Sequence, residues 1–129
     1  MLSLQVPMQL DLEKGSGILI RSFEEGKLHV NDQIIDTNVI LTSDEIIADW
    51  SPASLENLSI ADFELALARS PEVILLGTGL KQRFPNMQLI TEIVRQGIGF
   101  EIMNTAAACR TFNVLASEQR QVVAALFLR

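Results

Sequence analysis

PEVILLGTG, residues 71–79, and GIGFEIMNTAAACRTFN, residues 97–113, are the two stretches that decide the fold of this chain. Each predicts a buried strand that ends at a corner of small or polar residues, because a continuous apolar run is typical of a strand covered on both faces. The second corner leads directly into an alanine-rich helix. We therefore expect two neighbouring strands whose ends open onto one cleft.

The remaining segments divide the chain into a strand-rich first half and a half in which helices and strands alternate. Alternating or β-rich runs predict strands over 17–23, 27–30, 33–35, 39–42 and 46–50. Helical spacing predicts helices over 60–69, over 86–96 with Met87, Ile90, Ile93 and Val94 on one side, and over 105–115 after a cap at Asn104 or Thr105. The run 121–128 is compatible with either element, and its paired valines and terminal position favour a strand.

This order of elements predicts a single α/β domain over residues 1–129. Residues 46–76 and 73–103 both read as strand–helix–strand units, and each connection is long enough for parallel pairing with a right-handed crossover. We expect a central, largely parallel sheet with helices packed on it. Residues 17–42 should add a small β layer.

Composition and charge argue against a nucleic-acid-binding protein and against a membrane-spanning one. The net charge is −6, the ten basic residues are scattered and the chain has no tyrosine. These features argue against nucleic-acid binding, which needs a concentrated basic face. No apolar run is long enough to span a bilayer, and the N-terminus lacks the features of a secretory or mitochondrial signal, so we expect a cytoplasmic protein.

The candidate site lies where the two decisive strands end. Ligands of open parallel sheets sit outside the carboxyl ends of the strands, and glycines let a ligand or a second backbone approach closely. The glycines, short polar groups and cations of the predicted cleft are Gly77, Thr78, Gly79, Lys81, Arg83, Asn104, Thr105 and Arg110. A structural turn and a ligand contact both remain open for this corner. We predict no cofactor, because Gln82 occupies the third glycine position of the dinucleotide fingerprint.

Complete catalytic or metal sets are not found in the sequence. His29 is the only histidine, and its setting favours a structural role over a catalytic one. One histidine and one cysteine do not make a zinc finger or ribbon, so no metal is expected. Cys109 is expected to be a buried free thiol, although its place near a helix N-terminus beside Arg110 leaves a reactive thiol open. Trp50 and Phe63 are expected in the core.

Several runs together resemble one family of uncharacterised domains. They are Leu76–Gly79, Gly97–Thr105, Ala108–Leu115, Glu118–Arg120 and Ala124–Leu126. The family includes the mitochondrial complex I assembly factor 3 proteins and small bacterial and archaeal relatives, and the resemblance extends from about Gly17 to Leu128. Family members usually have Asp at position 104 and often Gly at position 119, where this chain has Asn104 and Gln119.

The resemblance implies a three-layer α/β fold with a mixed central sheet, an extra small β layer and a terminal strand antiparallel to the others. For function it implies an adaptor or assembly factor that acts through protein partners, without catalysis. The alternative is a protein, or an unrecognised enzyme, that binds a small molecule or anion in the predicted cleft. The apolar content and edge strands are also compatible with a homodimer.

Overall fold

The structure is a computed structural model that describes residues 17–129; the N-terminal residues, on which the signal prediction rests, lie outside this range. The described residues form the following helices and strands. They are β1 (Ile20–Glu24), β2 (Lys27–Val30), β3 (Gln33–Ile35), β4 (Val39–Leu41), β5 (Ile46–Ile47), the 3-10 helix η2 (Ile60–Phe63), α1 (Glu64–Leu67), β6 (Val73–Thr78), α2 (Met87–Val94), β7 (Gly99–Met103), α3 (Thr105–Ser117) and β8 (Val122–Phe127).

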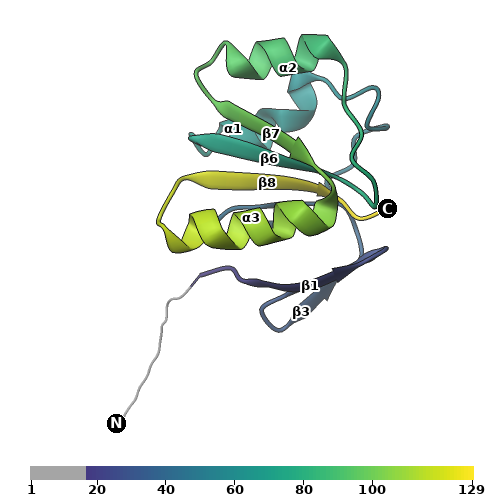
Figure 1. Cartoon of the computed structure of the whole chain (residues 1–129), viewed down its shortest axis with the longest axis vertical. Coiled ribbons are helices and arrows are strands. Elements are labelled where there is room, and N and C mark those ends of the chain that lie inside the picture. Colours follow the sequence, from purple (N-terminus) through teal and green to yellow (C-terminus); the bar gives the residue numbers. More distant parts are fainter. Residues whose placement is uncertain (1–16) are drawn as a thin grey trace.

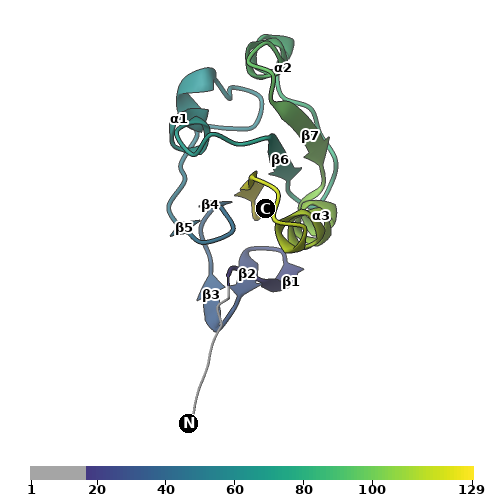
Figure 2. The same ribbon diagram turned by 90° about the vertical axis from the view of Figure 1, so that its left-hand side faces the viewer.

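The strands form two sheets, as the predicted fold class requires. The central sheet has the order β5-β4-β8-β6-β7, in which β6 pairs in parallel with β7 and β8 while β4 pairs antiparallel with β5 and β8. The small sheet β1-β2-β3 is antiparallel throughout. Figures 1 and 2 show this small sheet beside α3, at the opposite end of the molecule from α2. The α/β class, mixed sheet and extra β layer are confirmed.

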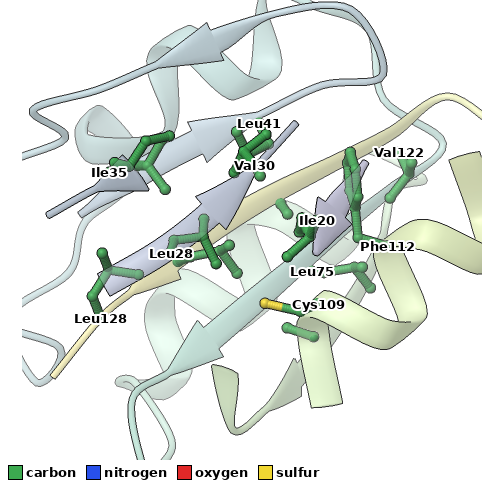
Figure 3. Close-up of a cluster of buried hydrophobic side chains, with 14 of the residues drawn as sticks. Ile20, Leu28, Val30, Ile35, Leu41, Leu75, Cys109, Phe112, Val122 and Leu128 are labelled. Atoms are coloured by element: carbon green, nitrogen blue, oxygen red, sulfur yellow. The ribbon is translucent and has the colours of Figure 1, made fainter. Parts of the chain in front are cut away.

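The core has two halves because successive side chains of a strand point to opposite faces of the sheet. Val73 and Leu75 of β6 pack with α3 and the small sheet, as Figure 3 shows for Leu75. Ile74 and Leu76 pack on the other face with α1 and α2. The strand β8 divides its side chains in the same way, so both central strands are buried on both faces.

Three expectations about strand pairing were wrong. The terminal strand β8 runs parallel to β6 and is antiparallel only to β4. The strand β4 belongs to the central sheet and not to the small layer. Within residues 46–76, β5 and β6 do not pair, because β4 and β8 lie between them. Placing β8 at the centre buries its continuous apolar run on both faces, which an edge position would not do.

The helix α2 packs through a face that agrees with the predicted one at Ile93 and differs from it at Met87 and Val94. Its buried side chains are Leu89 and Ile93, whereas Met87 and Val94 are exposed. The predicted core roles of Trp50 and Phe63 are confirmed. Their rings lie edge to face with centroids 5.6 Å apart, and the Trp50 indole N–H donates to the Asp62 carbonyl at 2.8 Å.

Candidate functional site

The two strand ends that the sequence singled out lie side by side. Strands β6 and β7 are parallel neighbours, with Gly77 opposite Met103. Beyond that pair, the Gly79 N–H donates to Thr105 Oγ1 at 2.8 Å and the Thr105 N–H donates to the Gly79 carbonyl at 2.9 Å. These reciprocal hydrogen bonds join the corner after β6 to the start of α3.

The glycines of this corner admit other parts of the same chain. A Cβ on Gly77 would lie 2.9 Å from Thr105 Oγ1, and a Cβ on Gly79 would lie 2.6 Å from the Arg129 carbonyl oxygen. Gly79 also has φ of +98°, which side-chain-bearing residues rarely adopt. The close approach that the two glycines allow is therefore made by Thr105 and by the C-terminal backbone.

The two threonine hydroxyls are hydrogen-bonded within the chain. Thr105 Oγ1, which is fully buried, donates to the Phe127 carbonyl at 2.6 Å while it accepts from Gly79. It thereby links the ends of β6, β7 and β8. Thr78 Oγ1 accepts from the Arg83 N–H at 3.1 Å and donates to the Lys81 carbonyl at 2.5 Å. Thr78 thus fixes the first turn of the loop after β6.

Asn104 is the N-cap of α3, one of the two caps predicted. Its side-chain oxygen accepts from the Ala107 N–H at 2.8 Å, and its extended backbone (φ −65°, ψ 160°) is typical of a cap. This bond satisfies one of the amides that a helix leaves unpaired in its first turn. Thr105 is consequently the first residue of the helix, which directs its hydroxyl to the strand ends.

The two arginines of the predicted cleft lie elsewhere. Arg83 forms an exposed ion pair in which Nη1 is 2.9 Å from Glu56 Oε2. Arg110 lines a hollow between α3 and β1, together with Arg21 and Cys109. The structure therefore brings Gly77, Thr78, Gly79, Asn104 and Thr105 together. The Arg83 backbone is bonded to Thr78, but its side chain pairs with Glu56, and Arg110 lines a different hollow.

The Cys109 thiol lies in the core, 6% exposed, with its sulfur near Ile20 and Leu75 (Figure 3). Burial raises the pKa of this thiol to about 12, and the opposing effect of the Arg110 charge is smaller. The thiol is thus neutral near pH 7, as a buried structural cysteine should be. Within residues 17–129, no three His, Cys, Asp or Glu side chains are grouped to hold a metal ion.

Sequence reasoning missed two asparagines that bind distant backbone. Asn113 on α3 accepts from the Ile20 N–H at 3.0 Å and donates to the Ile20 carbonyl at 2.8 Å, in the manner of a neighbouring strand. Asn38 accepts from the Leu128 N–H at 2.9 Å. The sequence feature that could have pointed to Asn113 is its position in the run Ala108–Leu115, which carries part of the family resemblance.

Comparisons with known proteins agree with this architecture. The family described as "Protein of unknown function (DUF498/DUF598)" matches residues 20–127. An NMR structure of a Xanthomonas campestris protein is 39% identical, with a TM-score of 0.80 and 92% of each chain covered. A Bordetella pertussis protein described as a Mth938-like domain has a TM-score of 0.75 at 22% identity, with 94% of this chain and 92% of that chain covered. The fold is accordingly Mth938-like.

Two curated relatives carry different names. The "13 kDa major membrane protein" of Francisella tularensis is 27% identical, over 81% of this chain and 86% of its own length. The NADH dehydrogenase (ubiquinone) 1 alpha subcomplex assembly factor 3 of Danio rerio is 29% identical over 88% of this chain, which spans 66% of that relative. Among the helices of residues 17–129, none has the length and apolar character needed to cross a bilayer.

Proposed function

This chain belongs to the DUF498/DUF598 family, and we propose that it acts as an adaptor or assembly factor by binding a protein partner. Complex I assembly is the role named for animal members of the family, including the Danio rerio relative. The observation that carries the proposal here is a set of exposed apolar side chains on Leu80–Met87, which runs from the loop after β6 to the first residue of α2 and which we call the docking segment.

The docking segment exposes three large apolar side chains within eight residues. Leu80 is 56% exposed, Phe84 is 62% exposed and Met87 is 70% exposed. Single exposed apolar residues are ordinary on protein surfaces, whereas a grouped set is typical of a binding site. Aromatic residues and methionine are also enriched in protein interfaces, which favours a protein as the partner.

The segment is held in one shape by the candidate site. Thr78 binds the backbone of Lys81 and Arg83, and the Gln82 side chain donates to the Ile102 carbonyl at 2.9 Å. At the other end, the Asn86 side chain donates to the Leu58 carbonyl at 2.8 Å. A surface that is already ordered loses less conformational entropy when it binds, and this supports a docking role.

We assign the strand-end corner a supporting role in this function. Gly77, Gly79, Asn104 and Thr105 join the ends of the strands to α3, and Thr78 extends that rigid corner into the docking segment. Their polar groups are used inside the chain, so we propose no ligand at this corner. The segment itself carries the exposed cation Lys81 and no acidic residue, which favours a partner with a carboxylate beside an apolar pocket.

Site-specific photocrosslinking in a native lysate tests this function. A photoreactive amino acid at Phe84 is compared with the same group at Ile34 on β3, which is equally exposed (60%) and apolar but outside the docking segment. We expect one protein to be captured in near-stoichiometric amount from position 84 and not from position 34. Capture of nothing at position 84, or of the same proteins at both positions, would contradict the proposal.

A surface variant provides a second arm. Phe84→Ser combined with Met87→Ser should abolish capture through a crosslinker at Leu80, while the free energy of unfolding changes by about 0.5 kcal/mol or less per site, as is usual for exposed positions. If the double variant captures the same partner as efficiently as the parent chain, the docking segment is not the binding surface.

We also propose that the protein works in the cytoplasm. The single cysteine is buried as a free thiol, so the fold uses no intrachain disulfide, as is usual in reducing compartments. Fractionation of the source cells checks this proposal, which predicts recovery in the cytosolic fraction at physiological salt. Recovery in the membrane fraction would overturn it and would agree with the name of the Francisella relative.

A further inference from the structure

A hollow of about 260 Å³ lies between β1 and α3, on the face of the sheet opposite to α1 and α2. Figures 1 and 2 both show β1 running beside α3. We propose that this hollow binds a small organic dianion through Arg21 and Arg110. This site is separate from the docking segment, and its lining residues come from two elements about 90 positions apart in the sequence.

The charges around the hollow are of one sign. Arg21 from β1 and Arg110 from α3 both line it, and no acidic residue does. Within residues 17–129, the arginines that form ion pairs are Arg69, Arg83 and Arg120, whose nitrogens lie 3.0, 2.9 and 2.8 Å from glutamate oxygens. Neither arginine of the hollow is among them. Two positively charged residues beside one hollow favour an anion between them, because like charges repel and an anion attracts both. The pair of cations matches a ligand with two negative charges.

The backbone on each side of the hollow is fixed. The pairing of β1 with β2 has a bulge between Ile20 and Ser22, which places Arg21 at the irregular position. Bulges are often found next to binding sites, where they redirect a side chain. At Ile20, the residue directly before Arg21, both the backbone N–H and the carbonyl are hydrogen-bonded to the side chain of Asn113 on α3. The distance between β1 and α3 is therefore set by a hydrogen-bonded contact at one end of the hollow.

The helix supplies space as well as charge. Ala106, Arg110 and Asn113 are spaced four and three residues apart, so they lie along one face of α3. The small side chain of Ala106 leaves room beside Arg110. A larger side chain at position 106 would project from the same face and occupy the hollow.

The lining also indicates the chemical class of the ligand. Guanidinium groups bind carboxylates and phosphates through paired N–H donors, and the Ser22 hydroxyl adds a further donor. Ile20 and Phe23 supply apolar surface for a carbon skeleton. Because the hollow is smaller than the usual range for drug-sized ligands, the ligand is compact. A short dicarboxylate or a small phosphate monoester fits these requirements. The neutral Cys109 thiol adds no competing charge.

Titration of the isotope-labelled full chain, followed by amide NMR, tests the site. The probes are succinate and inorganic phosphate, each compared with chloride at the same ionic strength and pH. We expect saturable shifts centred on the amides of Ser22 and Arg110 with at least one probe, and the two probes together distinguish carboxylate from phosphate preference. Shifts that do not saturate, or that chloride reproduces, would overturn the proposal.

Three variants make the test specific. Arg21→Gln and Arg110→Gln should each weaken binding at least tenfold, whereas Arg95→Gln, which removes an exposed arginine at the end of α2, should leave it unchanged. Ala106→Leu should block binding by filling the hollow while both arginines remain. If Arg95→Gln weakens binding as much as Arg110→Gln, or if Ala106→Leu binds normally, the anion is not bound in the hollow.

Discussion

Replacing Thr105 with valine should be among the most damaging conservative substitutions in this chain. Valine has nearly the same shape as threonine, so the packing around residue 105 is kept while the hydroxyl is lost. That hydroxyl accepts from the Gly79 N–H at 2.8 Å and donates to the Phe127 carbonyl at 2.6 Å, and all three residues are buried. The substitution therefore leaves two backbone groups without these partners and away from water.

The size of the effect follows from these two groups. An unsatisfied buried donor or acceptor costs about 1–3 kcal/mol, so the loss of partners for two such groups in Thr105→Val should cost about 2–6 kcal/mol. This is a large share of the roughly 5–15 kcal/mol that stabilises a typical domain. Thr105→Ser keeps both hydrogen bonds and removes one methyl group, which should cost only about 1 kcal/mol.

Urea denaturation followed by circular dichroism measures these differences. The midpoint should fall strongly for Thr105→Val and slightly for Thr105→Ser, with similar slopes if the unfolded states are alike. Thr91→Val, on the exposed side of α2, is the control for the exchange itself and should change the free energy of unfolding by about 0.5 kcal/mol or less. Equal midpoints for Thr105→Val and Thr105→Ser would refute the assigned role of the hydroxyl.

Two further predictions concern Gly79 and Cys109. Gly79→Ala should destabilise the fold more than Gly97→Ala, as measured by thermal unfolding, because both glycines have positive φ (+98° and +79°) but the new Cβ would meet the Arg129 carbonyl oxygen at 2.6 Å only at position 79. The Cys109 thiol, whose pKa is raised by burial to about 12 from 9.0, favours unfolding as pH rises from about 9, because the unfolded chain releases its thiol proton first. The parent chain should therefore lose stability relative to Cys109→Ala as pH rises from about 8 to 11, and parallel pH profiles of the two chains would contradict this.

The sequence predicted elements more reliably than it predicted their partners. The apolar run in β6 and the cap at Asn104 are local signals, and both were recognised. The position of β8 between β4 and β6 depends on pairing between segments about 85 and 49 residues apart, as in the Leu41–Ala124 and Val73–Val122 partners. No local pattern records which strands pair. The family resemblance implied that β8 is antiparallel to the other strands, which is right for β4 and wrong for β6.

The candidate site shows the same limit at the level of side chains. The sequence placed Gly77, Gly79 and Thr105 at one corner, and the structure agrees. What it could not show is that the C-terminal backbone of Arg129 and the hydroxyl of Thr105 occupy the space beside these glycines. Glycine permits a close approach without specifying what approaches. The same residues therefore predicted a ligand site and serve to pack the chain against itself.

Most side chains of the run 108–113 have a structural role. Ala108, Cys109 and Phe112 are core residues, and Thr111 donates to the sulfur of Met103 at 3.6 Å. Asn113 holds the backbone of β1. Each of these side chains has a structural role that explains its residue type.

Arg110 is the exception in that run. Its side chain is exposed and, within residues 17–129, has no ion pair, yet it lines a hollow that Arg21 also lines. The proposed anion site would give the cation at this position a role that packing among the described residues does not give it. Substitution of Arg110 by glutamine therefore separates the proposed anion binding from the stability of the fold, because an exposed side chain contributes little to that stability.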